Sequence, residues 1–151
     1  MMRLKQCVFG LAFALVLVQA FAKEAEIQAP GPEGPLKGTI TTAQNPTPPF
    51  ALIVPGSGPI DRDGYSPIIG QTNTYKLLSE GLLKHGISTV RFDKRGMFGS
   101  AAALSDPNAV TYSDYASDVK TWVATIQKQT GAKCVWLIGH SEGGLVSLVA
   151  A

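Results

Sequence analysis

Cysteine is scarce in this sequence, and that excludes one class of protein. Cys7 and Cys134 are the only cysteines among 151 residues, and Cys7 lies in a leader segment described below. A single remaining thiol cannot form an intrachain disulfide, so a disulfide framework is excluded. Cys134 stands in an apolar segment, which favours a small buried hydrophobic residue over a reactive thiol. Internal repeats, low-complexity tails and a Walker phosphate-binding pattern are also absent.

The first 22 residues have the layout of a secretory signal peptide. Arg3 and Lys5 precede an apolar run at 7–18, and an A-x-A cleavage site ends at Ala22. The run is shorter than the roughly 20 residues that a membrane-spanning helix needs. We therefore expect cleavage after Ala22, export to the periplasm or the exterior, and a mature chain 23–151 without a stable membrane span. An uncleaved membrane anchor is the alternative.

A surplus of positive charge is absent from the mature chain. The 13 Lys and Arg residues exceed the 11 Asp and Glu residues by two, and Arg3 and Lys5 of the leader account for that excess. A chain without net charge lacks the electrostatic signature of a nucleic-acid or anionic-membrane partner. We expect neither partner.

From residue 50 onward, strand-like and helix-like segments alternate. Strands are expected at 50–54, 87–92 and 134–138, and helices at 74–84, about 113–130 and 142–151. Two shorter strands are expected earlier, at 26–29 and 36–42, around a proline-rich turn. Because the later strands are apolar on both faces, the order predicts a mostly parallel sheet of about five strands with helices on both sides.

Two of the helices carry an apolar stripe at the 3.6-residue period, which we expect to face the core. Ser113 or a neighbour caps the second of them, and Gly131 ends it. The stripes are Tyr75, Leu78 and Leu82 in the first helix and Tyr115, Val119, Trp122 and Ile126 in the second.

The pentapeptide Gly139-His140-Ser141-Glu142-Gly143 lies between the last apolar strand and a helix of small residues. Gly-x-Ser-x-Gly in this setting is the pattern of a nucleophile elbow, a turn so tight that the serine backbone is strained. Gly139 and Gly143 leave room for the turn. The pattern predicts that Ser141 is a nucleophile.

Three segments carry a wider resemblance: Ala-Leu-Ile-Val-Pro-Gly-Ser-Gly-Pro at 51–59, Arg-Phe-Asp-Lys-Arg-Gly-Met-Phe-Gly-Ser at 91–100, and Gly-His-Ser-Glu-Gly-Gly at 139–144. Together they resemble the N-terminal half of a bacterial exported α/β-hydrolase of the serine-aminopeptidase-like or dienelactone-hydrolase-like kind. The resemblance implies an α/β-hydrolase fold. It also implies a serine hydrolase that acts on carboxylic esters or small amides through an acyl-enzyme, without a metal or other cofactor.

By this resemblance, two main-chain N–H groups form the oxyanion hole. One is the amide of Glu142 at a helix N-terminus. The other comes from the loop after the 50–54 strand, which reads Pro55-Gly56-Ser57 and makes Ser57 the donor. Pro55 replaces the family's usual histidine, but the donor is a main-chain group. The alternative is that this segment is only a turn. The side chain of Glu142 is expected to be a solvated acid at the helix start.

Two further motifs invite a binding role and fail on spacing. The acidic segment at 61–64 has its glycine at the fourth rather than the sixth position of a calcium loop, and Thr72 stands where the loop needs Glu. A loop near the active-site mouth is the better interpretation. Gly56-Ser57-Gly58 begins like a dinucleotide fingerprint, but Asp61 occupies the third glycine position.

The charged turn at 91–100 is expected to be structural. Arg91 and Arg95 flank Asp93 and are available to pair with it. Charged clusters of this kind usually fix loops.

The sequence lacks a credible base for Ser141. In this fold the order is Ser, then Asp or Glu, then His, and no histidine follows Ser141. His85 is expected at the opposite edge of the sheet, and His140 is directed away by the turn. The 134–138 strand would also be left at an edge. The chain therefore resembles a hydrolase truncated after its elbow: a truncated gene product, a fragment or a partial record.

Two functions remain open at this stage. The first is an ester or amide hydrolase whose Asp and His lie outside these residues, so that the chain alone is inactive. The second is a non-catalytic remnant or a binding module on a hydrolase scaffold. A nucleotide-binding domain is disfavoured by the incomplete glycine fingerprint.

Overall fold

The computed structural model describes residues 23–104 and 106–151. The expected signal peptide at 1–22 lies outside the described residues. Among the described residues, no helix combines the length and apolarity needed to cross a membrane.

The described residues form one mixed five-stranded sheet, in the order β1-β2-β6-β3-β7. The strand pairs β1–β2 and β2–β6 are antiparallel, whereas β6–β3 and β3–β7 are parallel. Four of the five strands therefore run in the same direction, as expected. The strands are β1 Lys23–Ala29, β2 Leu36–Thr42, β3 Phe50–Val54, β6 Ser88–Phe92 and β7 Val135–Gly139.

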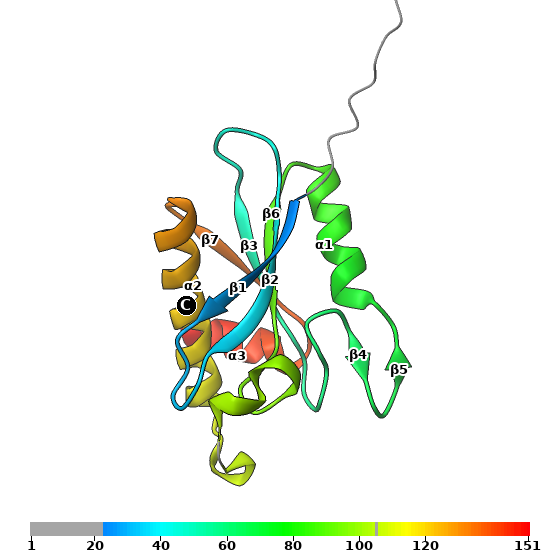
Figure 1. The fold of residues 1–151 in the computed structure, drawn as a ribbon, viewed down its shortest axis with the longest axis vertical. Helices are drawn as coiled ribbons and strands as arrows, with labels where there is room; N and C mark the ends of the chain where they lie inside the picture. Colours follow the sequence, from blue (N-terminus) through cyan, green and yellow to red (C-terminus); the bar gives the residue numbers. More distant parts are fainter. Residues whose placement is uncertain (1–22, 105) are drawn as a thin grey trace, which may run out of the picture.

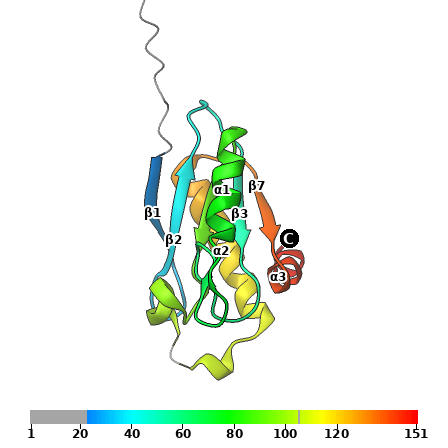
Figure 2. The same ribbon diagram turned by 90° about the vertical axis from the view of Figure 1, so that its right-hand side faces the viewer.

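Three α-helices cover the two faces of this sheet. The helix α1 lies on one face, and α2 lies on the other (Figures 1 and 2), where α3 packs beside it. Their bounds are α1 Thr74–Lys84, α2 Tyr112–Thr130 and α3 Glu142–Ala150. The smaller elements were not predicted. They are the hairpin β4 Tyr65–Ser66 and β5 Gly70–Gln71 and the 3-10 helices η1 Phe98–Ala103 and η2 Pro107–Ala109.

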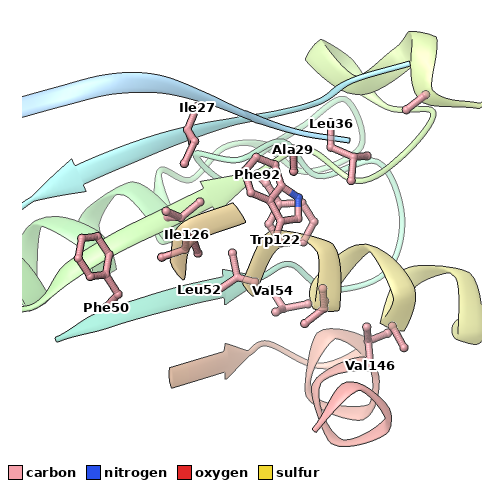
Figure 3. Packing of buried hydrophobic residues seen from close by; sticks show 14 residues of the cluster. Ile27, Ala29, Leu36, Phe50, Leu52, Val54, Phe92, Trp122, Ile126 and Val146 are labelled. Carbon is pink, nitrogen blue, oxygen red and sulfur yellow. The ribbon is translucent and has the colours of Figure 1, made fainter. Parts of the chain in front are cut away.

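The core lies between the sheet and α2. Every residue of β3 and β6 is buried. Strand β3 is a continuous apolar run, as a covered strand requires, whereas three of the five buried residues of β6 are polar or charged: Ser88, Thr89 and Arg91. Figure 3 shows Trp122 and Ile126 of α2 directed toward the strands, and the Trp122 and Phe92 ring centroids lie 5.4 Å apart. The predicted stripe of α2 is confirmed for Val119, Trp122 and Ile126, and Tyr115 packs against the same cluster while partly exposed.

Most predicted element boundaries agree with the structure. The bounds predicted for β2, β3 and α1 are those observed. Strand β1 begins three residues earlier than expected because Lys23, Glu24 and Ala25 continue its pairing with β2. The cap of α2 is Thr111, which forms a capping box with Asp114,.

The buried side of α1 differs from the predicted stripe. Tyr75 is buried as expected, but Leu78 is 38% exposed and Ser79 is fully buried. The hydroxyl of Ser79 hydrogen-bonds to those of Thr41 on β2 and Thr89 on β6. The prediction was wrong for Leu78 because this helix rests on a patch of strand hydroxyls that bond a serine.

Strand β7 lies at the edge of the sheet and exposes apolar side chains. Within the described residues it pairs only with β3, and Trp136 is 66% exposed. Cys134, just before the strand, is exposed, so the expectation of a buried residue is wrong. Within the described residues, β7 therefore leaves the hydrogen-bonding groups of one side without a neighbouring strand.

We predict that Trp136 promotes self-association of this chain, because an exposed apolar edge strand is a template for pairing. Replacing Trp136 by Lys should increase the monomer fraction in gel filtration with light scattering. The control is Leu77→Lys on α1, which is 59% exposed but remote from the edge. An equal gain from both variants would contradict an edge-specific effect.

Candidate active site

The candidate nucleophile lies in the turn between β7 and α3. Ser141 has φ 52° and ψ −120°, a backbone conformation that side chains other than glycine rarely adopt. The residue is exposed and precedes the first residue of α3. The strained turn expected from the sequence is present, and it places Ser141 beyond the carboxyl end of β7.

Two glycines allow α3 to approach the sheet closely enough for this turn. A Cβ on Gly139 would lie 2.3 Å from the carbonyl oxygen of Gly143, and a Cβ on Gly143 would lie 2.3 Å from that of Val54. Both distances are far below a van der Waals contact. The elbow is therefore packed backbone against backbone onto the end of β3.

The loop after β3 lies beside the elbow. A Cβ on Gly56 would lie 3.1 Å from Nδ1 of His140 and 3.4 Å from Cβ of Ser141. The amide of His140 also donates to the carbonyl of Val54 at 3.0 Å. The structure thus brings the loop that contains Ser57 next to Ser141, as an oxyanion hole requires.

Within the part of the chain that the structure describes, the two expected oxyanion donors have no protein acceptor. Glu142 is the first residue of α3, where N–H groups have no partner within the helix, and Ser57 is exposed. Among the residues that the structure describes, neither amide donates a hydrogen bond to a protein group. Both N–H groups are thus free to bind an anion, and their role in a hole remains a prediction.

His140 contacts a buried tyrosine. Its Nδ1 lies 3.0 Å from the hydroxyl of Tyr75, which also accepts the amide proton of Gly56 at 3.0 Å. Burial raises the pKa of Tyr75, although the Gly56 hydrogen bond acts in the opposite direction. The hydroxyl therefore stays protonated and ties the loop, α1 and the elbow together.

Neither histidine is placed as a base for Ser141. One ring nitrogen of His140 is engaged by Tyr75. His85 follows the last residue of α1, near the start of β6. Since Ser141 lies beyond the opposite ends of the strands, a five-residue strand, roughly 16 Å long, separates the two levels. The described residues therefore provide no base.

Lys94 is a buried cation that no sequence motif had indicated as part of the site. Its Nζ donates to the carbonyl of Gly56 at 2.7 Å, lies 3.9 Å from Oε2 of Glu142 and stands 5.3 Å from the centre of the Tyr115 ring. The Glu142 side chain is only 19% exposed, so the expectation of a solvated acid is wrong. The sequence feature that could have indicated it is a lysine two residues beyond the end of a buried strand.

The charged turn after β6 is structural, but its partners differ from those expected. Asp93 accepts hydrogen bonds from Nε and Nη2 of Arg62 at 2.9 and 2.7 Å, and not from its sequence neighbours. Arg91 instead pairs with Glu24 of β1, and Arg95 with Asp118 of α2. Successive charged residues point to different elements, so the turn joins β1, the 61–63 loop and α2.

The segment at 61–64 forms a tight turn. Oδ1 of Asp61 accepts the amide protons of residues 63, 64 and 65 at 2.9, 2.8 and 2.7 Å. Within the described residues, no cluster of three or more Asp, Glu, His or Cys side chains is arranged to hold a metal ion.

A cavity of about 120 Å³ lies beside His140. Ile60, Ile69 and Tyr75 line it together with small polar residues of the segment between β3 and α1. Of the 61–64 loop, Gly64 lines this cavity; the loop's expected place near the mouth of an active site stays a prediction. The cavity offers mainly apolar walls next to the elbow.

The fold and the elbow define the class of this protein as an α/β-hydrolase, and solved structures have the same fold. Similar structures include the α/β hydrolase GrgF from a Penicillium species (20% identity, TM-score 0.68, 85% of this chain and 41% of that chain). Others are an α/β serine hydrolase without a lid from Xanthomonas campestris (24%, 0.63, 85% and 56%) and a dienelactone hydrolase from Anabaena variabilis (22%, 0.65, 86% and 57%). The chain spans about half the length of these proteins.

Residues 68–151 match the family model of the serine aminopeptidases, S33. The match covers more than half of the chain and includes α1, the charged turn and the elbow. The chain belongs to this serine aminopeptidase family of α/β-hydrolases. No curated protein sequence matches it.

We predict that Gly143→Ala destabilises the elbow while Gly144→Ala does not. The added methyl group at 143 would collide with the Val54 and Pro55 carbonyls, whereas at 144 its nearest neighbour would be the Gly139 carbonyl oxygen at 3.7 Å. The first change should lower the free energy of unfolding by about 1–3 kcal/mol. The second should be neutral or stabilising by about 0.5–1 kcal/mol, since alanine favours a helix. Urea denaturation followed by circular dichroism measures both, and equal effects would refute the packing argument.

Proposed function

We propose that this chain forms the nucleophile-bearing part of a serine hydrolase that cleaves carboxylic esters or small amides. The observation that carries the proposal is the strained Ser141 turn, with its φ of 52°, packed beside a loop and a helix start that both present unpaired N–H groups. In this arrangement the serine Oγ can attack a substrate carbonyl carbon while the N–H groups donate hydrogen bonds to the negative charge that develops on the carbonyl oxygen. Family membership supports the same chemistry.

In the proposed reaction, Oγ of Ser141 attacks the substrate carbonyl carbon and the C=O π electrons move to oxygen. The amides of Ser57 and Glu142 stabilise this oxyanion. The Oγ proton goes to a histidine base, which returns it to the departing alcohol or amine as the acyl-enzyme forms. Water then attacks the acyl-enzyme and releases the acid. We place the base and its acidic partner in residues that follow α3 in the complete enzyme.

One observation bears on the substrate class. The cavity beside His140 has mainly apolar walls, which favours an uncharged acyl group. The family name points to amide substrates and the similarity to a dienelactone hydrolase points to esters, so we propose both.

We predict that hydrolysis depends on Ser141 and requires more than this chain. Two proteins are compared: the chain itself and the product of the full reading frame that contains it. The chain alone should neither hydrolyse p-nitrophenyl acetate nor react with a fluorophosphonate probe. A product that supplies an Asp and a His after Ser141 should do both, and Ser141→Ala should lower kcat by on the order of 10⁶-fold.

The matched control is Ser117→Ala, an exposed serine on α2, which should leave the rate unchanged. Turnover by the chain alone that is lost on Ser141→Ala would contradict the need for an outside base. A longer product with no Ser141-dependent turnover would instead favour a non-catalytic binding module.

We also propose that the chain is exported through the segment at 1–22. Its basic start, short apolar run and Ala20-Phe21-Ala22 site support this proposal. Expression in a bacterial host should yield a protein that begins at Lys23 in the periplasm or medium, as read by mass spectrometry. Replacing Ala20 and Ala22 by bulky residues should block the cleavage, whereas an unprocessed native chain in the membrane fraction would indicate an anchor.

A further inference from the structure

Lys94 is a buried cation that contacts the residue before one candidate oxyanion donor and the side chain of the other. It follows β6 by two residues and is buried between β3, α2 and α3. Its ammonium donates to the carbonyl of Gly56, the residue before Ser57, and faces the carboxylate of Glu142. The shorter contact, at 2.7 Å, is the one to the main chain.

The Gly56 carbonyl and the Ser57 amide belong to one peptide group. In a trans peptide the C=O and N–H bonds point in opposite directions, and no described peptide bond is cis. When Lys94 holds the carbonyl toward the interior, the Ser57 N–H must point away from Lys94. The preceding peptide is fixed as well, since the amide of Gly56 donates to the Tyr75 hydroxyl.

We propose that Lys94 is a positioning residue for the oxyanion hole, which acts by holding the Gly56 carbonyl and so directing the Ser57 N–H. This inference rests on the proposed function, because it needs Ser57 to be a donor. A charged donor on the carbonyl also polarises the peptide group, which makes its N–H a stronger donor to an anion. Lys94 would thus both orient and strengthen one of the two donors.

A purely structural role for Lys94 predicts a different dependence on its two contacts. If Lys94 served only to neutralise Glu142, the ion pair with that carboxylate at 3.9 Å would account for the charge at this buried position, and the hydrogen bond to the Gly56 carbonyl would have no effect on the Ser57 N–H. A buried pair kept for stability alone is also readily replaced by apolar residues. The two roles are separated by removing Glu142's charge without touching Lys94.

The charge state of Lys94 offers a direct signal. Burial lowers its pKa, and Glu142 acts in the opposite direction. The groups that face the ammonium are Glu142 from α3 and the Tyr115 ring from α2, and burial raises the pKa of Tyr115. Loss of the Lys94 proton therefore begins at a lower pH than for an exposed lysine. It should weaken the hydrogen bond to the Gly56 carbonyl.

The test uses the purified chain labelled with ¹³C and ¹⁵N. The Gly56 carbonyl carbon and the Ser57 amide nitrogen should titrate with the same midpoint as the Lys94 Cε resonance. Lys94→Met should remove that titration step and shift both signals, and Lys120→Met on the exposed side of α2 should change neither. Glu142→Gln should move the midpoint but keep the step.

The proposal is overturned if the Gly56 carbonyl carbon of the native chain does not titrate with the midpoint of the Lys94 Cε resonance. This measurement does not depend on the folding of any variant. Loss of the step in Glu142→Gln also overturns the proposal, in favour of a structural ion pair.

In an active longer product, Lys94→Met should lower kcat for p-nitrophenyl acetate by roughly tenfold to a hundredfold, with little change in KM. An unchanged kcat overturns the positioning role. Activity that survives Ser141→Ala overturns the proposed function instead, so the two failures are distinguishable.

Discussion

The site depends on one close approach, between the first turn of α3 and the carboxyl end of β3. Gly143 lies so near the Val54 carbonyl that no side chain fits between them, and the His140 amide bonds to that same carbonyl. Because β3 continues directly into Pro55 and Gly56, fixing the elbow on β3 also fixes it beside the loop. The candidate nucleophile and the loop that contains Ser57 thus share one support, and the strain at Ser141 is sustained by packing on both sides.

A second set of contacts comes from the charged residues that follow β6. Asp93, Lys94 and Arg95 are consecutive, yet they bind Arg62, the Gly56 carbonyl and Asp118 respectively. Three neighbouring side chains thereby connect the strand end to the loop at Arg62, to the loop at Gly56 and to α2. Each is buried, and a buried charge without its partner is costly. The short turn therefore holds separate parts of the site in a common frame.

The sequence predicted what local patterns determine. The bounds of β3 and α1, the Gly131 end of α2 and the strained elbow follow from residues close together in the chain. It could not predict contacts between distant segments: Arg62 lies 31 residues from Asp93, and Lys94 lies 38 residues from a main-chain carbonyl that has no side-chain signature. Ser79 was missed because its burial depends on Thr41 and Thr89. Cys134 was misplaced because its exposure depends on which strand lies at the edge.

The hydroxyl of Tyr75 has a consequence for how such a site can diversify. It joins α1 to both the elbow and the loop at Gly56. Tyr75 and His140 also line the cavity beside the elbow, whereas Ile60 and Ile69 line it from outside this pair of hydrogen bonds. Residues such as Ile60 and Ile69 can therefore change in size while the nucleophile keeps its position. A change at Tyr75, in contrast, would alter both the cavity wall and the contacts that hold the Ser141 turn.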